Sequence, residues 1–130
     1  MKTLALDIGD RWVGVAISDP LGIIARPYET VEIKNVYDFL KKTIAQELIT
    51  TIVVGYPKTL RGTESEQTKK TVLYVEELKN TFSDIHWVLW DERLTSKQAA
   101  QIKQAKTKEQ KKKSHALAAA LILNTFLEFQ

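Results

Sequence analysis

The sequence predicts an α/β domain with one mixed sheet of about five strands, the first three antiparallel, and helices on both faces. Two observations carry this prediction. Short apolar segments separated by glycine and proline fill residues 3–30, which is typical of strands joined by tight turns. After residue 35, helical apolar spacing alternates with short apolar runs, and this order is expected when helices connect the strands of a sheet that they cover.

The first half of the chain divides into strands and one helix by its apolar spacing. Strands are predicted at residues 3–7, 12–18 and 23–30, and Asn35 can cap a helix. The apolar stripe of this helix recurs every four residues, at Val36, Leu40, Ile44 and Leu48. Residues 51–55 are β-branched and almost wholly apolar, which predicts a parallel strand covered on both faces.

The second half continues the alternation. A strand is predicted at residues 85–90, between an amphipathic helix at about 63–80 and a short helix that ends near residue 105. A lysine-rich linker then leads to a strongly apolar helix at 114–127. This order of strands and helices is that of the ribonuclease H fold. The length allows one such domain, residues 1–130, without a repeat or a domain linker.

Composition excludes several classes of protein. The chain has no cysteine, which excludes disulfides and thiolate metal sites and agrees with the reducing cytoplasm, where we expect this protein to reside. The longest apolar run, residues 116–123, is much shorter than the roughly 18 residues that span a bilayer. Because Asp7 also interrupts the apolar start, we expect neither membrane insertion nor export.

The charges are distributed unevenly along the chain. Residues 93–113 hold eight basic residues and one acidic residue, whereas residues 1–92 hold 11 basic and 14 acidic residues. A basic segment beside an acidic body suits a protein that holds a polyanion next to metal-binding carboxylates. The alternative is a solvated lysine-rich loop, which charge alone favours.

Two predicted strands end in acidic side chains. Asp7 ends the first strand before a glycine turn, and Asp91-Glu92-Arg93 ends a later apolar strand. Ionised groups at such places must be paired, solvated or bound to a metal. Carboxylates from separate strands suit Mg²⁺ or Mn²⁺, and two such ions can activate a water and stabilise the leaving oxygen of a phosphodiester. Asp7 and Glu92 are therefore the predicted ligands, and hydrolysis of a nucleic-acid backbone is the predicted chemistry.

Each of these carboxylates also has a purely structural explanation. Asp7 can accept hydrogen bonds from the turn at Gly9, as aspartates commonly do. Glu92 can pair with Arg93 at a solvated strand end. The metal hypothesis therefore requires that the two carboxylates meet.

Four motifs, in order, resemble the YqgF family over essentially the whole chain. They are Asp7-Ile8-Gly9 with residues 13–20, residues 52–57 with Gly62-Thr63-Glu64, residues 90–95, and residues 116–123. That family is described as ribonuclease H-like, related to the RuvC Holliday-junction resolvases and assigned to trimming the 5′ end of pre-16S ribosomal RNA. The resemblance implies a nuclease for precursor ribosomal RNA, with four-way DNA as the alternative substrate.

The resemblance also implies roles for individual residues. Asp7 corresponds to the metal ligand of the first strand and Glu92 to the acid of the later strand, with Asp91 as a less favoured substitute. The family pattern places a third acid directly before the alanine-rich run, where this chain has His115. Imidazole can ligate a divalent ion, Mn²⁺ more readily than Mg²⁺, so His115 is the predicted third catalytic ligand. Asp10, where the family usually has a hydroxyl residue, can add a carboxylate.

Basic side chains near these motifs are predicted to contact the nucleic-acid backbone, where they would set affinity and not sequence choice. The predicted contacts are Lys58, Arg61, Arg93, Lys97, Lys111, Lys112 and Lys113. The expected partners are nucleic acid and ribosomal particles, and the expected oligomeric state is a monomer or a weak homodimer.

Two other classes of protein are alternatives to a nuclease. ATP-binding proteins of the actin and sugar-kinase type also carry Asp-x-Gly after a first strand, but they clamp nucleotide between two such domains, and this chain has room for one. A catalytically inactive RNA-binding module is the second alternative, because His115 replaces the expected acid. Metal-dependent cleavage separates the nuclease from both.

Overall fold

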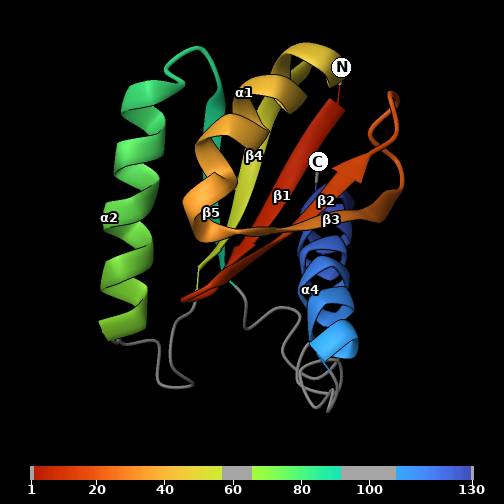
Figure 1. Ribbon diagram of the computed structural model, residues 1–130. Coiled ribbons are helices and arrows are strands. Elements are labelled where there is room, and N and C mark those ends of the chain that lie inside the picture. Colours follow the sequence, from red (N-terminus) through yellow and green to blue (C-terminus); the bar gives the residue numbers. More distant parts are fainter. Residues whose placement is uncertain (1, 57–65, 92–107, 130) are drawn as a thin grey trace.

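The computed structural model describes residues 2–56, 66–91 and 108–129. Its five-stranded sheet has the order β3-β2-β1-β4-β5 (Figure 1). The strands are β1 (Lys2–Ile8), β2 (Trp12–Ser18), β3 (Ala25–Glu32), β4 (Ile49–Tyr56) and β5 (His86–Asp91). The helices are the 3₁₀ turn η1 (Ile33–Asn35) and the α-helices α1 (Val36–Glu47), α2 (Glu66–Thr81) and α4 (Lys108–Glu128). None of the helices within these ranges is long and apolar enough to cross a membrane.

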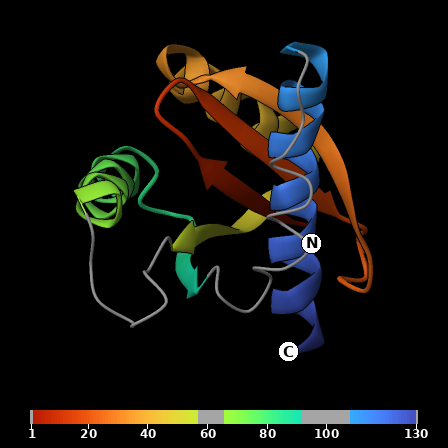
Figure 2. The same ribbon diagram turned by 90° about the horizontal axis from the view of Figure 1, so that it is seen from below.

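The sheet is mixed, as the sequence predicts. Strands β1, β2 and β3 form antiparallel pairs, whereas β4 runs parallel to both β1 and β5. Helices α1 and α2 cover one face and α4 covers the other, which Figure 2 shows along the edge of the sheet. The parallel pairing brings the carboxyl ends of β1, β4 and β5 to the same edge of the sheet, and the candidate site lies there.

The two faces of the sheet carry different side chains because direction alternates along each strand. On β1, Leu4, Leu6 and Ile8 pack in the core under α1 and α2. Ala5 packs against α4. The α4 face also includes the small residues Ala16, Ala119 and Ala120, so the helix can lie close to the sheet.

Helix α4 begins earlier than the sequence analysis expects. It starts at Lys108 and not at Ser114, so Lys111, Lys112 and Lys113 belong to the helix and not to a linker. Lysine, glutamine and glutamate are good helix formers, and a charged first part can extend a helix whose apolar part docks on the sheet. The predicted lysine-rich linker is therefore wrong at its C-terminal end, while the predicted helix near residue 105 lies outside the described residues.

The predicted start and end of helix α1 also need correction. Asn35 occupies the position before the helix, but its side chain makes no capping hydrogen bond, because the 3₁₀ turn leads directly into the helix. Leu48 does not extend the apolar stripe. It adopts a left-handed conformation with φ of 54° after the helix ends, and its side chain is 73% exposed. Thr43 is buried instead.

Strand β3 begins at Ala25 because the residues before it form a turn around Asp19. The Asp19 Oδ1 atom accepts hydrogen bonds from the backbone N–H groups of Ile23 (2.7 Å) and Ile24 (2.9 Å). These two residues, which the apolar pattern assigned to the strand, are exposed. An aspartate that satisfies consecutive amides is a common way of fixing a turn.

We expect this turn to loosen at acidic pH. Hydrogen bonding from the amides of Ile24 and Ile23 lowers the pKa of Asp19 below its ordinary value of 3.8. The carboxylate therefore stabilises the folded turn above the unfolded-state pKa, and this contribution is lost as the pH falls through the lower folded-state pKa. Asp19→Ala should accelerate amide hydrogen exchange at Ile23 and Ile24 at neutral pH. Asp84→Ala, at another exposed turn, should not, and equal exchange in the two variants would contradict this account.

Candidate active site

Asp7 is the most unusual charged residue of the described chain. Its side chain is only 4% exposed, and its backbone lies opposite Gly14 in the antiparallel pair of β1 and β2. Strand alternation places Asp7 on the same face as Ala5, which packs against α4. Within the described ranges, no hydrogen-bond donor or cation reaches its carboxylate. A carboxylate in a largely buried side chain favours a cationic partner.

The structural explanation of Asp7 is wrong. The N–H of Gly9 donates to the backbone oxygen of Trp12 at 2.9 Å, so the turn after β1 closes on itself and does not use the Asp7 side chain. The carboxylate is thus left for another partner. This outcome could not be read from the sequence, in which Asp-x-Gly fits both arrangements.

His115 lies at the same end of the sheet, on the α4 face. Its Cε1 atom is 3.7 Å from the position that a Cβ on Gly9 would occupy, and Gly9 follows Asp7 by two residues. The backbone of His115 packs directly on Gly14, the strand partner of Asp7. The fold therefore brings His115 and Asp7 to one place, although 107 intervening residues separate them in the chain.

Gly14 makes this approach possible, and sequence reasoning missed its role. A Cβ at this position would lie 2.0 Å from the His115 carbonyl oxygen and 2.8 Å from the Ala116 nitrogen. Only a residue without a side chain allows the helix backbone this close. The available signal was a glycine inside an apolar strand, which often marks a close backbone approach.

The end of β5 lies at the same edge, two strands from Asp7. The register pairs Leu6 with Val54 and Val54 with Leu89, so the three strands end at one level. Adjacent strands lie roughly 4.8 Å apart, which puts the backbones of β1 and β5 about 10 Å apart. One residue further along, at the level of Asp7 on β1 and Trp90 on β5, the strand β4 carries Gly55. Gly55 has no side chain to fill the space between β1 and β5.

The remaining predicted site residues cannot all be placed. Asp91 ends β5, but its side chain is not among those described, and Glu92, Arg93, Lys97, Lys58 and Arg61 lie outside the described residues. For Lys111, Lys112 and Lys113 only the helical backbone is described. Within the described part of the chain, no three acidic or histidine side chains gather as a metal site.

One basic residue near the turn was also missed. The guanidinium of Arg11 lies over the ring of Trp12, with Cζ 5.3 Å from the ring centroid. Stacking of this kind holds a cation beside the turn that follows Asp7. Arg11 is itself exposed, so this cation faces solvent next to the turn.

Known proteins resemble this chain over nearly its whole length. The profile of the family described as "RuvX: Holliday junction resolvase" matches residues 1–129. A protein of Sulfurihydrogenibium named "Putative pre-16S rRNA nuclease" is 41% identical over 98% of this chain and 90% of its own length. A protein of Thermoanaerobacter pseudethanolicus with the same name is 42% identical over 100% of this chain and 98% of its own length.

Solved structures with low sequence identity share the fold. The Holliday-junction complex of Thermus thermophilus RuvC matches with a TM-score of 0.59 at 14% identity, covering 99% of this chain and 95% of that one. The fowlpox virus Holliday junction resolvase matches with a TM-score of 0.57 at 12% identity over the whole of both chains. The mixed sheet and the face-covering helices are therefore those of RuvC-like resolvases, which confirms the predicted ribonuclease H-like fold. The chain belongs to the RuvX family, also called YqgF, which is the family that its four ordered motifs indicate.

Proposed function

We propose that this chain, a nuclease by its family, hydrolyses phosphodiester bonds with divalent metal ions and matures the 5′ end of pre-16S ribosomal RNA in the cytoplasm. Residues 1–130 form a single nuclease domain in this proposal. The proposed ligands are Asp7, Glu92 and His115, with Asp91 as a substitute for Glu92. The ions are Mg²⁺ or Mn²⁺.

The buried carboxylate of Asp7 is the observation that carries this proposal. It lacks a donor or cation in the described part of the chain, and it stands at the edge where β1, β4 and β5 end. An oxygen ligand in such a position fits a hard divalent cation. The half-buried His115 adds a nitrogen donor at the same end of α4, so the available groups fit Mn²⁺ at least as well as Mg²⁺.

Each proposed residue has a definite task. Divalent ions bound at this edge would activate a water for attack on phosphorus and offset charge on the leaving oxygen. Asp7, held rigidly in the middle strand of the sheet, fixes where the scissile phosphate must sit. His115 supplies a nitrogen ligand from the α4 side. Arg11 and the basic residues of 93–113 hold the flanking phosphates by charge, which supports binding without base preference.

The names of the relatives support ribosomal RNA as the substrate, whereas the family description supports four-way DNA as an alternative. Proteins 41% and 42% identical carry the name of a pre-16S ribosomal RNA nuclease, which favours precursor 16S ribosomal RNA as the substrate. The family description and the RuvC complex favour four-way DNA. Symmetric cutting of a junction would need two copies of the site, so dimerisation belongs to that second proposal, whereas a monomer suffices for trimming.

One assay tests the activity and the choice of substrate together. End-labelled precursor 16S ribosomal RNA and a labelled four-way DNA junction are incubated with the protein and either Mg²⁺ or Mn²⁺. We expect shortening of the RNA at its 5′ side and an intact junction. Paired nicks in the junction would instead establish the resolvase, and no change in either substrate with either ion would overturn the enzyme proposal.

Restoring the family's acid at position 115 should change the metal preference. With His115→Asp, we expect the ratio of Mg²⁺-supported to Mn²⁺-supported cleavage to rise roughly tenfold, because a hard oxygen replaces a softer nitrogen. His86→Asp, at the exposed start of β5, is the matched control and should leave the ratio unchanged. If both variants behave like the wild type, His115 is not a ligand. If only His115→Asp cleaves, the natural chain is the inactive binding module.

A further inference from the structure

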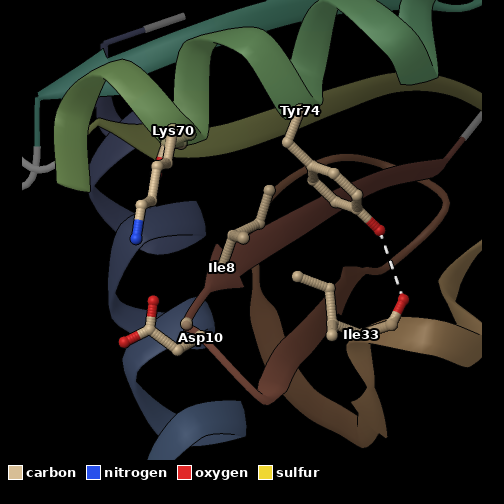
Figure 3. A pocket seen from close by; sticks show the side chains of 7 residues that line it. Ile8, Asp10, Ile33, Lys70 and Tyr74 are labelled. Atoms are coloured by element: carbon tan, nitrogen blue, oxygen red, sulfur yellow. Dashed lines mark hydrogen bonds between the residues drawn. The ribbon is translucent and has the colours of Figure 1, made fainter. Parts of the chain in front are cut away.

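A hollow lies at the same edge of the sheet as the candidate active site, on the face opposite α4. It has a volume of about 280 Å³ and lies between the turn after β1 and helix α2. Figure 3 shows its labelled residues converging from β1, the turn, η1 and α2. Its lining consists of Ile8, Gly9, Asp10, Ile33, Lys70, Thr71 and Tyr74. This volume is just below the roughly 300–1,000 Å³ of typical ligand pockets, so it suits one small planar group.

This hollow adjoins the candidate active site through a single residue. Gly9 lines the hollow, and a Cβ on Gly9 would lie 3.7 Å from the His115 ring. Asp7 and Ile8 are neighbours whose side chains point to opposite faces of the sheet. A polynucleotide with a phosphate at Asp7 therefore needs only to pass over the Gly9 turn for an adjacent nucleotide to reach the hollow.

The walls of the hollow are apolar and include a fixed aromatic ring. Tyr74 donates a hydrogen bond from its hydroxyl to the backbone oxygen of Ile33 at 3.3 Å. Burial, followed by the charges of Tyr37 and Glu77, raises the pKa of Tyr74 to about 12, so this hydroxyl remains a donor. Ile8 and Ile33 supply the remaining apolar surface. Unpaired bases are commonly bound by stacking on such rings.

Two opposite charges stand across the other end of the hollow. The amine of Lys70, from α2, and the carboxylate of Asp10, from the turn, point toward each other in Figure 3. None of the ion pairs among the described residues joins them, so both remain available to a ligand. Together they offer a donor next to an acceptor, which is the pattern that the pairing edge of a base can match.

We infer that this hollow binds one unpaired base of the nucleic-acid substrate, with guanine preferred. Lys70 donates to the guanine O6 atom, Asp10 accepts from the N1–H and N2–H groups, and Tyr74 packs against the base. Guanine fits best because its pairing edge alone has two adjacent N–H donors, which match the Asp10 carboxylate, next to a carbonyl acceptor, which matches the Lys70 amine. Uracil fits worst because its single donor is flanked by two carbonyl oxygens. This inference rests on the proposed function, and it adds a base preference to a site otherwise built to contact phosphates.

Binding without cleavage isolates the hollow from the catalytic site. The intact protein is titrated, with EDTA present, into four fluorescein-labelled heptaribonucleotides of uridine that carry guanine, adenine, cytosine or uracil at the centre, and anisotropy is measured at fixed salt. We expect the guanine oligonucleotide to bind about tenfold more tightly than all-uridine. Addition of 5′-GMP should shift the methyl resonances of Ile8 and Ile33.

Matched variants separate base recognition from general attraction to phosphate. Lys70→Ala and Asp10→Asn should remove most of the guanine preference. Lys69→Ala removes the same charge at the neighbouring exposed position, where the lysine is 3.9 Å from Glu66, and should preserve the preference. Asp84→Asn is the corresponding control for Asp10. Tyr74→Phe should also preserve the guanine preference, because the aromatic ring that packs against the base remains.

The outcomes distinguish this inference from the proposed function. Equal binding of the four oligonucleotides, or equal losses in Lys70→Ala and Lys69→Ala, would overturn the base site even if the protein cleaves RNA. A guanine preference that depends on Lys70 and Asp10 would support it even if no cleavage is found. In that case the proposed nuclease chemistry fails and the hollow stands as a binding site.

Discussion

Asp7→Asn should abolish cleavage while leaving the protein folded. Asparagine has the shape of aspartate but no charge, and it is a poor ligand for a divalent ion. A bound metal ion typically contributes several kcal/mol of transition-state stabilisation. Losing about 4 kcal/mol of it lowers kcat about a thousandfold. Because the carboxylate lies buried without a donor or cation in the described part of the chain, its neutralisation should leave the metal-free protein as stable as the wild type or more so.

Two measurements separate loss of metal from loss of fold. The first is the cleavage rate with Mn²⁺, and the second is the melting temperature with and without Mn²⁺. An ion that binds only the folded state raises the melting temperature of the wild type, and this rise should vanish in Asp7→Asn. Asp38→Asn makes the same chemical change at an exposed position of α1. This control should keep both the cleavage rate and the increase in melting temperature that Mn²⁺ causes. An active Asp7→Asn variant would remove Asp7 from the site.

Local patterns in the sequence predict most of the fold. Apolar spacing gave every strand that the structure describes, because the burial of alternate residues depends on short-range geometry. The amphipathic helix predicted at about 63–80 is present as α2, which buries Thr68, Thr71, Val75 and Leu78 on one face and leaves Val72 half-buried. The errors lie where tertiary contacts decide.

The two clearest errors illustrate this limit. Leu48 fits the helical spacing of α1, but the chain leaves the helix there in a left-handed conformation. The lysines at 111–113 read as a linker, whereas the backbone continues as helix α4. An irregular lysine-rich linker and an exposed lysine-rich helix have similar compositions, so composition alone does not distinguish them.

The candidate site was only partly predictable for the same reason. Asp7 was found because it ends an apolar strand and opens the first motif that resembles the family. His115 was found because it stands where the family pattern has an acid, and the structure brings the two residues to one end of the sheet. The hollow that includes Asp10, Lys70 and Tyr74 was missed because its lining comes from elements that have no shared spacing in the chain. Such a site is defined only after the fold places α2 beside the turn that follows β1.

Among the three glycines whose surroundings the structure describes, Gly14 should tolerate alanine least. The new Cβ would lie 2.0 Å from the His115 carbonyl oxygen and 2.2 Å from its carbonyl carbon. These are backbone atoms of a helix, so no side-chain rotation relieves the clash and α4 must move away from β2. We expect a loss of about 3 kcal/mol in the free energy of unfolding. This loss lowers the melting temperature by about 10 °C in a chain of this size.

The same displacement should also impair catalysis. Moving His115 away from the level of Asp7 misplaces one proposed ligand relative to another, and an error of about 1 Å can lower the rate about a hundredfold. The rate should therefore fall even at temperatures where Gly14→Ala is fully folded by circular dichroism. Cleavage rates and thermal melts of the same samples separate the two effects.

Gly22→Ala is the matched control, because it adds the same methyl group where no atom lies within 4 Å. Its backbone φ of +70° disfavours alanine by about 1 kcal/mol, so it should melt slightly lower than the wild type and cleave normally. If Gly14→Ala were no worse than Gly22→Ala in both measurements, α4 would not lie against β2 at His115. The histidine would then have no fixed position beside Asp7, and a ligand set built from these two residues would lose its geometric basis.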